Sequence, residues 1–551
     1  MKESKTTPIV ADNVIRDEQG DPASKAEFAA LEADAAEATR REHAMTILEA
    51  LKLYPKATAW SLLLSTAIIM EGYDTALITN FFALDAFNRQ YGTLQADGTY
   101  VVSAAWRTGF TVASACGAML GLWAAGLFQQ RYGYRWTMIV SLVSLTGFTA
   151  LTVFAENAVT QLVGQILCGI PWGVFQTLTT AYASDVCPLA LRAYLTTYVN
   201  LCWIIGQLIA AGVLRAMVNV TSDWGFRLPF ALQWVWPVPI LIGSCFAPES
   251  PYWLVQMGRI KEARYSLKRL TSSGDESNID TTLAMMQYTN ETEKEAAAGL
   301  SYFDCFKKTN LRRTEIVCGV YQVQELCGSG IMAYSTVFFE EAGLPTTQSF
   351  NMSMVQYALG VIGGVLAWWL MIGFGRRTLY VWGTWVLCVV IMGTGFCGIV
   401  TNTAASWAAG TLLLVYSLIY NFTLGPVCYS LVAEIPSTRL KSKTIILSRN
   451  LYNVTGIIIN ILINYQLTST SWNWGAKSGF FWGGLCFLCG LWCQFRVPEP
   501  KGRTYAELDA LFEQGVSARA FRTTEVHIFD GVIEDTVEVV QQENAGAKKS
   551  V

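Results

Sequence analysis

Apolar and polar positions fall into long alternating blocks along this chain. Twelve mostly apolar runs approach the length of about 20 residues that a helix needs to cross a bilayer. Short polar stretches separate most of them. This pattern predicts an all-α membrane protein with twelve transmembrane helices. The runs centre on residues 57–83, 101–128, 136–155, 159–183, 194–214, 229–247, 315–339, 350–373, 379–400, 406–432, 444–466 and 478–496.

The longer polar segments divide the chain into parts. Residues 1–50 are polar and acidic, a charged stretch at 248–314 separates the sixth run from the seventh, and 498–551 is polar again. We therefore expect six-helix bundles at 51–247 and 315–497, joined by a linker with short helices. The first segment lacks the apolar core of a cleaved signal peptide and is predicted to be a disordered tail.

Lysine and arginine are unevenly distributed between the two sets of loops. The set that includes the long linker is rich in both, whereas the opposite set carries only Arg89, Arg215, Arg227 and Lys477. Basic residues accumulate in cytoplasmic loops. We therefore expect the linker and both tails to face the cytoplasm in this multi-pass membrane protein.

Short charged motifs occur twice, in the same order, at corresponding ends of the apolar runs. This repetition predicts two pseudo-symmetric halves related by an axis along the membrane normal, as in major-facilitator transporters. Acid–base pairs on the cytoplasmic face could form and break as the halves rock, since an exposed pair contributes only ~0–1 kcal/mol. The alternative is ordinary positive-inside residues. The predicted inner-gate residues are Arg131, Arg135, Asp185, Arg192, Glu249, Arg376, Arg377, Glu434, Arg439, Lys441 and Glu499.

Two carboxylates interrupt the first apolar run. Glu71 and Asp74 stand three residues apart and therefore share one face of a helix. An ionisable residue at mid-bilayer costs roughly 2.5–3.5 kcal/mol on insertion scales, so the pair calls for a functional explanation. Such carboxylates could carry a proton across the membrane, with Arg449 of the eleventh run as an ionic partner. The alternative is a structural pair that is hydrogen-bonded to neighbouring helices.

Amides and aromatic residues are also frequent at membrane depth. A sugar presents hydroxyl groups and apolar C–H faces, so its site needs amides, carboxylates and aromatic rings. Each residue alone could serve helix packing. Together, without a buried Lys or His cluster, they favour a neutral polyol as substrate. The candidates are Gln207, Gln324, Glu325, Tyr334, Tyr429, Tyr452 and Asn453.

The composition argues against several other functions. Only 15% of the residues are charged, against about 25% in soluble proteins, and the net charge of −3 gives no reason to expect a nucleic-acid partner. Both histidines lie in the polar tails, and Cys486, Cys489 and Cys493 fit packing within one apolar helix. We expect no enzyme activity, metal or cofactor, and a monomer that interacts with a sugar, protons and lipid.

Longer motifs carry a resemblance to a known family. The chain resembles the sugar-porter branch of the major facilitator superfamily and, within it, the fungal maltose and general α-glucoside permeases. The likeness covers most of residues 50–525 and implies proton-coupled symport of an α-glucoside by alternating access. It rests on Met70-Glu-Gly-Tyr-Asp-Thr-Ala76, Pro248-Glu-Ser-Pro-Tyr-Trp-Leu254, Gly425-Pro-Val-Cys-Tyr429, Ala433-Glu-Ile-Pro-Ser-Thr-Arg439 and Pro498-Glu-Pro-Lys-Gly-Arg503.

The resemblance also implies roles for individual residues. Asp74 falls at the proton-coupling acid of the first helix, and Gln207 falls at a sugar-binding glutamine of the fifth. Gln324 and Glu325 fall at paired glutamines of the seventh helix, where Glu325 is a departure from the family pattern. Tyr429 takes the place of the tenth-helix aromatic residue. Tyr452 and Asn453 lie near the polar position of the eleventh helix.

Three further departures leave the details of proton coupling and gating open. Gln130 replaces an acid of the loop motif, Gln165 replaces a fourth-helix arginine of many proton-coupled porters, and Ala118 replaces a second-helix acid of some maltose permeases. Two other functions remain as alternatives. One is a non-transporting sugar sensor, for which the C-terminal tail is short. The other is a passive hexose or glucoside facilitator, against which the first-helix acids argue.

Overall fold

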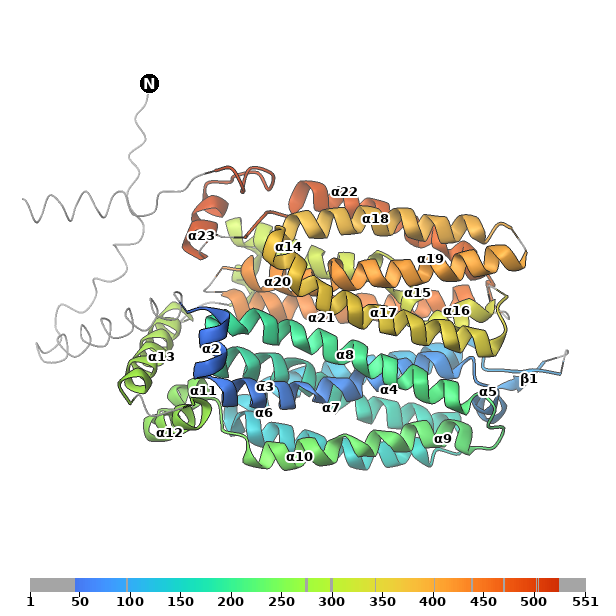
Figure 1. Cartoon of the computed structure of the whole chain (residues 1–551), viewed down its shortest axis with the longest axis horizontal. Coiled ribbons are helices and arrows are strands. Elements are labelled where there is room, and N and C mark those ends of the chain that lie inside the picture. The colour runs from blue at the N-terminus through green and yellow to red at the C-terminus, as the bar shows by residue number, and fades with distance from the viewer. Residues whose placement is uncertain are drawn as a thin grey trace, which may run out of the picture.

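The structure is a computed structural model that describes residues 45–524, except 96–97, 273–275, 298–300, 342, 401, 438–439, 469–470, 502 and 504. Long helices run side by side. Those of the first half of the chain form one group and those of the second half form another group beside it (Figure 1). Short linker helices lie beyond one end of the bundle, called here the linker end. A small β-hairpin projects from the opposite end, called here the hairpin end (Figure 1).

The first half begins with a capped helix and a proline-led one. The Thr46 side chain and Glu49 form a capping box at the start of α2, and Pro55 begins α3. The elements are α2 (Ile47–Leu53), α3 (Pro55–Ser65), α4 (Ala67–Phe81), α5 (Asp85–Tyr91), β1 (Thr93–Leu94), β2 (Tyr100–Val101), α6 (Ala104–Val153), α7 (Ala158–Val186), α8 (Leu189–Met217), α9 (Trp224–Ala231), the 3₁₀ helix η1 (Leu232–Val235) and α10 (Pro237–Phe246). The two strands pair antiparallel.

The second half contains the matching series of spanning segments. Gly328, with φ of 103°, separates α14 from α15 and interrupts the seventh predicted run. The elements are α14 (Lys308–Leu326), α15 (Ser329–Ala333), α16 (Ser335–Glu341), α17 (Thr346–Gly373), α18 (Arg376–Cys397), α19 (Thr403–Phe422), α20 (Leu424–Glu434), α21 (Lys441–Leu467), the 3₁₀ helix η4 (Gly475–Lys477) and α22 (Ser478–Arg496).

Ten helical segments among the described residues are long and apolar enough to cross a membrane. One of them, α6, has 50 residues and turns at Gly133, where φ is 83° and ψ is −178°, so it contains the second and third predicted runs. Dividing α6 at Gly133 raises the ten segments to eleven. The interrupted segment α14–α16 is the twelfth spanning segment. The prediction of an all-α membrane protein with twelve spanning helices is confirmed.

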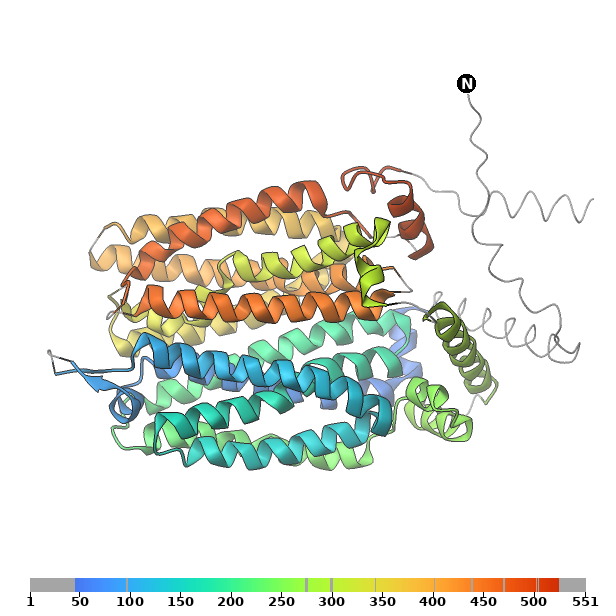
Figure 2. The same cartoon turned by 180° about the vertical axis from the view of Figure 1, so that it is seen from behind.

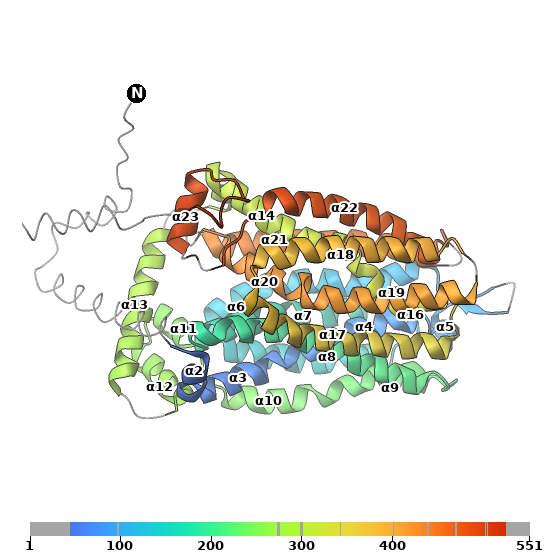
Figure 3. The same cartoon turned by 45° about the horizontal axis from the view of Figure 1, so that its top comes forward.

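Polar segments outside the spanning helices are also folded. The linker forms α11 (Pro251–Gln256), α12 (Ile260–Leu270), α13 (Glu276–Ala297) and the 3₁₀ helix η2 (Tyr302–Phe306). Figure 3 shows α13 crossing the linker end from α12 toward α23 (Tyr505–Glu513). The buried rings of Phe512 and Phe521 lie beside the guanidinium of Arg312, and Arg313 donates to the Leu508 carbonyl. The start of the predicted C-terminal tail is therefore packed on the second half.

Glycine allows close helix contacts within the first half. A Cβ at Gly117 or Gly173 would lie 2.1 Å from a backbone oxygen of the facing helix, so α6 and α7 touch through their backbones. The same holds for α4 and α8, where a Cβ at Gly72 would lie 2.0 Å from the Trp203 carbonyl oxygen. Lipid supplies no hydrophobic force between helices, so membrane helices rely on such small-residue contacts. The contact places the acid-bearing α4 against α8, which carries Gln207.

The two halves meet along a few helix pairs. α8 packs on α17 and α20, α6 packs on α21, and α4 packs on α16. From behind, the orange α21 lies directly beside the blue first part of α6 (Figure 2). Side chains of α4, α7, α14, α20 and α21 come together between these contacts and form the candidate site.

Candidate transport site

Glu71 is connected to the second half of the chain through Gln176. Glu71 on α4 is 9% exposed, and its Oε1 accepts a hydrogen bond of 2.5 Å from Gln176 Nε2 on α7. Gln176 Oε1 in turn accepts a hydrogen bond of 3.2 Å from the Arg449 guanidinium on α21. Among the described residues Arg449 forms no ion pair with Glu71. The two residues are therefore linked through a glutamine rather than in direct contact, and their role as partners in proton coupling remains a prediction.

Three tyrosines surround Arg449. Its guanidinium carbon lies 4.6 Å from the ring centre of Tyr452 and 5.7 Å from that of Tyr321, distances typical of cation–π contacts. Tyr321 also packs edge-to-face on Tyr429, with ring centres 6.3 Å apart. The carboxylate of Glu325 is turned toward the Tyr452 hydroxyl. The structure thus places Glu325, Tyr429 and Tyr452, three predicted sugar-site residues, next to the predicted coupling arginine.

Several polar atoms around this cluster are buried without a hydrogen-bond partner. They include Glu71 Oε2, Arg449 Nη1, Gln324 Oε1 and Asn453 Nδ2. A buried polar atom left unpaired costs about 1–3 kcal/mol, so native proteins keep few of them without a reason. A ligand with several hydroxyl groups would supply the missing partners.

Asp74 points into the first half, away from the contact between halves. It is 3% exposed, and its Oδ1 accepts a hydrogen bond of 2.6 Å from Gln233 Nε2 on η1. The indole of Trp172 on α7 also faces it. On the same α7, Gln165 is fully buried and neither of its amide atoms has a partner. Neither first-helix carboxylate faces lipid, but the two reach different surroundings.

The remaining sugar-site candidates lie nearby or are already paired. Gln207 is buried on α8, the helix that packs against α4. Tyr334, between α15 and α16, donates to Asn460 Oδ1 at 3.0 Å and accepts from Asn464 Nδ2 at 3.1 Å. The Tyr334 hydroxyl is therefore hydrogen-bonded within the second half, to the amides of Asn460 and Asn464.

Reasoning from sequence missed Gln176, Gln233 and Tyr321. All three interrupt apolar runs, and Tyr321 lies in the same run as Gln324 and Glu325. A position three residues before Gln324 and four before Glu325 shares a helix face with both, and this spacing could have identified Tyr321. Gln176 and Gln233 are uncharged, so nothing in the pattern separated them from other amides at membrane depth.

Hydrogen bonds join the halves near both ends. At the hairpin end Arg215 Nε donates to Asn351 Oδ1 at 2.6 Å, and Asn464 Nδ2 lies 3.3 Å from Thr111 Oγ1. Nearer the linker end, Trp368 Nε1 donates to Thr197 Oγ1 at 2.8 Å. None of these pairs was predicted, because all but Arg215 are uncharged.

The predicted gate acids of the first half bind partners within that half. The Glu249 carboxylate accepts hydrogen bonds from the backbone N–H of Tyr134 at 2.8 Å and of Arg135 at 3.2 Å. Burial raises the pKa of Glu249, although these N–H groups oppose the rise. Asp185 accepts from the Tyr134 hydroxyl at 2.8 Å, and Arg131 is exposed. Glu249 therefore caps the part of α6 that follows Gly133.

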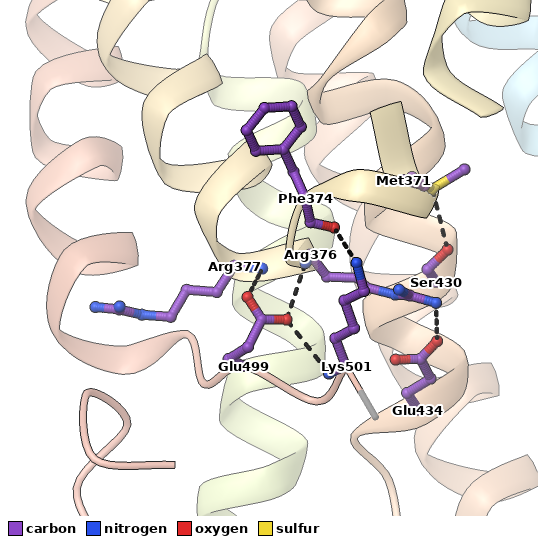
Figure 4. Close-up of polar contacts among 8 residues, drawn as sticks. All are labelled: Met371, Phe374, Arg376, Arg377, Ser430, Glu434, Glu499 and Lys501. Carbon is purple, nitrogen blue, oxygen red and sulfur yellow. Dashed lines mark hydrogen bonds and ion pairs between the residues drawn. The ribbon is translucent and has the colours of Figure 1, made fainter. Parts of the chain in front are cut away.

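The second half repeats this arrangement. Glu499 accepts hydrogen bonds from the backbone N–H of Arg376 at 2.9 Å and of Arg377 at 3.2 Å, at the start of α18 (Figure 4). The Arg376 guanidinium pairs with Glu434 at 3.4 Å, whereas that of Arg377 points away from Glu499 and donates to the Val497 carbonyl (Figure 4). An acid at a helix N-terminus satisfies free N–H groups and complements the helix dipole.

No helix-capping contact is described for the other three gate candidates. Arg192 follows the turn into α8 and is partly buried. Arg439 and the side chain of Lys441 lie outside the described residues. Each contact given above for a gate acid stays within one half. A gating role for these residues remains a prediction.

Gly375 tests the cap in the second half. An alanine Cβ there would lie 2.0 Å from Glu499 Oε2, and that carboxylate cannot move without losing two backbone hydrogen bonds. We expect Gly375→Ala to destabilise the protein by ~1–3 kcal/mol, measured as the thermal unfolding midpoint in detergent. Gly373→Ala is the matched control, because a Cβ there meets nothing within 4 Å. Equal midpoints for the two variants would contradict the cap.

Comparison with known proteins identifies the family. The family described as "Sugar (and other) transporter" matches residues 60–512. The chain belongs to this family. Among similar proteins of Saccharomyces cerevisiae, Alpha-glucosides permease MPH3 of strain YJM789 is 46% identical over 516 residues, covering 92% of this chain and 85% of the relative. Maltose permease MAL31 of strain ATCC 204508 / S288c is 45% identical over 503 residues, covering 90% and 82%.

Solved structures show the same fold for this sugar transporter. The xylose transporter XylE from E. coli, in a partially occluded inward open conformation, superposes with a TM-score of 0.67 at 19% identity, covering 82% of this chain and all of XylE. XylE bound to 6-bromo-6-deoxy-D-glucose, described as a major facilitator superfamily proton:xylose symporter, gives 0.65 at 20% identity, covering 83% and 99%. The predicted family and major-facilitator fold are confirmed, and the protein is a transporter rather than an enzyme.

Proposed function

We propose that this sugar transporter carries an α-glucoside, a maltose-like di- or oligosaccharide, together with a proton by alternating access. The observation that supports this most is the buried Glu71 carboxylate, which reaches the arginine of the opposite half through one amide. A titratable group at the contact between moving halves can make their movement depend on a proton. The names of the yeast relatives, α-glucosides permease and maltose permease, support the substrate class.

The cluster around Arg449 fits a sugar. Tyr321, Tyr429 and Tyr452 offer ring faces, which pack well against the apolar C–H face of a pyranose. The unpaired atoms of Gln324 and Asn453 lie on α14 and α21, which pack together, and could bind sugar hydroxyls. We assign Gln207 and Glu325 to the same site, with Tyr334 in support through the Asn460 and Asn464 amides.

We further propose that the protein is a monomer of the plasma membrane, with the linker end and both termini in the cytoplasm. The hairpin end then faces outward. The Arg215–Asn351 and Asn464–Thr111 contacts there would have to separate for a sugar to enter from outside. At the cytoplasmic end, the acids that cap helix starts would contribute to the inner gate by fixing the positions of the helix ends in each half.

Uptake of labelled maltose tests the proposed function. In cells that lack their own glucoside carriers, we expect expression to produce accumulation above the external concentration, and an uncoupler to reduce it to equilibration. Accumulation requires an energy source, and the proposed source is the proton gradient.

The two alternatives give different results in the same assay. Uptake that reaches equilibration and ignores the uncoupler would indicate a passive facilitator. Sugar-dependent signalling without uptake would indicate a sensor. Competition by a panel of unlabelled glucosides would then define the substrate. A vector-only strain and a strain that carries Asp74→Asn are the controls.

A further inference from the structure

We propose that Gln176 is an amide relay, which makes the link between the two halves depend on whether Glu71 holds a proton. The proposal rests on the proposed proton symport and deepens it. Gln176 would be a positioning residue, since it acts through Glu71 and Arg449 rather than on the sugar.

The two hydrogen bonds of Gln176 require one orientation of its amide. Arg449 can only donate, and an ionised Glu71 can only accept. The amide satisfies both, because its NH₂ group faces Glu71 at 2.5 Å and its oxygen faces Arg449 at 3.2 Å. With Glu71 ionised, α4, α7 and α21 are therefore joined by a continuous donor-to-acceptor chain.

A proton on Glu71 weakens this chain. Glu71 Oε1 accepts the bond from Gln176 and Oε2 has no partner, so the proton is taken up at Oε2. Oε1 then becomes a neutral carbonyl oxygen, and its bond from Gln176 loses the charge assistance that makes such a bond about twice as strong. The less polarised Gln176 oxygen in turn binds Arg449 less tightly, so protonation of Glu71 weakens the link between α7 and α21.

The position of the Gln176–Arg449 bond determines which end of the bundle it keeps closed. Gln176 lies ten residues before the linker-end terminus of α7 at Val186, and Arg449 lies eight residues after the linker-end start of α21 at Lys441. Both are in the half of their helix nearer to that end. Weakening of the link therefore favours opening toward the linker, and its recovery favours closure there. A carrier that opens inward with sugar and proton both bound, and returns outward after both have left, is a symporter.

Other groups around the relay do not replace it. No carboxylate forms an ion pair with Arg449 among the described residues, and its Nη1 lacks a partner. The rings of Tyr321 and Tyr452 hold the guanidinium in place by cation–π contacts. The titratable and charged groups that interact electrostatically with Glu71 or Arg449 are Asp74 on α4, Tyr321 and Glu325 on α14, Cys428 and Tyr429 on α20, and Tyr452 on α21.

Two substitutions with opposite expected effects test the relay. In proteoliposomes with an inward-directed proton gradient, Gln176→Leu should lower maltose accumulation about tenfold or more, because the charged hydrogen bond is lost in both protonation states. Its gradient-free maltose counterflow should continue and lose its pH dependence. Gln176→Glu should slow both activities, because a carboxylate at this position holds Arg449 whatever the state of Glu71.

Gln161→Leu is the matched control. Gln161 lies on the same helix, is fully buried, and has no partner at either amide atom, so its replacement by leucine removes no hydrogen bond. We expect this variant to accumulate maltose and to exchange it as the wild type does.

The outcomes separate the relay from the function on which it rests. If the wild type shows no gradient-driven accumulation, the proposed symport is wrong and the relay falls with it. If the wild type accumulates and Gln176→Leu accumulates equally, only the relay is wrong. Parallel loss of accumulation and counterflow in Gln176→Leu would make Gln176 a structural or sugar-binding residue. Should that variant fail to fold, unaltered transport by Gln176→Glu would overturn the relay.

Discussion

Asp74→Asn is expected to abolish proton-driven accumulation of sugar and to leave sugar exchange intact. Asparagine keeps an oxygen to accept the 2.6 Å hydrogen bond from Gln233, so the local structure should persist, but it cannot bind or release a proton. A proton gradient equivalent to about 100 mV is worth ~2.3 kcal/mol per proton and supports roughly 50-fold accumulation. The variant should therefore accumulate no more than equilibration allows, while its counterflow stays near the wild-type rate.

The matched control is Asp85→Asn, which removes a carboxylate at the hairpin end of the same half. Asp85 is exposed and pairs with Arg89, four residues away, so its contribution should be small. Accumulation should survive in this control. If Asp74→Asn also accumulates maltose, Asp74 does not couple transport to protons. Glu71, at the contact between the halves, would then be the remaining first-helix candidate.

The spanning helices could be predicted from sequence because lipid imposes a simple rule. A helix surrounded by hydrocarbon must be long and apolar, and this leaves twelve readable runs. The rule does not reveal breaks inside a run. Gly328 begins a new helix within the seventh run through its positive φ, yet it resembles other glycines of the chain that stay helical. The converse case is α6, in which two predicted runs are joined through the single non-helical residue Gly133.

Two acids of the repeated motifs occupy the predicted positions but bind other partners than the predicted ones. Duplication correctly brings Glu249 and Glu499 to equivalent places, and it suggested acid–base pairing at a gate. In the structure each carboxylate binds backbone N–H groups at a helix start, because Gly133 and Gly375 have no side chain to keep it away. A motif identifies which residues share an end of the bundle. It does not distinguish a guanidinium from a backbone amide as the partner.

The pairing of Glu71 with Arg449 shows the same limit at the site. Two opposite charges at membrane depth predict an interaction, and one exists. That Gln176 stands between them depends on the relative rotation and height of α4, α7 and α21, which no single helix encodes. The folded segment at 505–524 could not be predicted either, since it is too short and too charged to span a membrane and its docking surface comes from helices far away in the sequence.

The contact between α4 and α8 leads to the second large effect. A Cβ at Gly72 would lie 2.0 Å from the Trp203 carbonyl oxygen, and one at Gly206 would lie 2.1 Å from the Ile69 carbonyl oxygen. These atoms belong to helix backbones and cannot rotate away as a side chain could. Gly72→Ala must therefore push the two helices apart. Overpacking costs ~1–3 kcal/mol and occasionally more, a loss of roughly 5–150-fold in any equilibrium that needs the native spacing.

Gly72→Ala should therefore reduce both folded yield and transport, including the counterflow that Asp74→Asn preserves. Glu71 and Asp74 lie on either side of Gly72, so a shift of α4 would move both carboxylates away from Gln176 and Gln233. Gly212→Ala on α8 is the control, because a Cβ there meets nothing within 4 Å. Fluorescence-detected size exclusion would measure yield, and counterflow would measure function. Wild-type counterflow in Gly72→Ala would mean that the position of α4 against α8 does not determine where the carboxylates act.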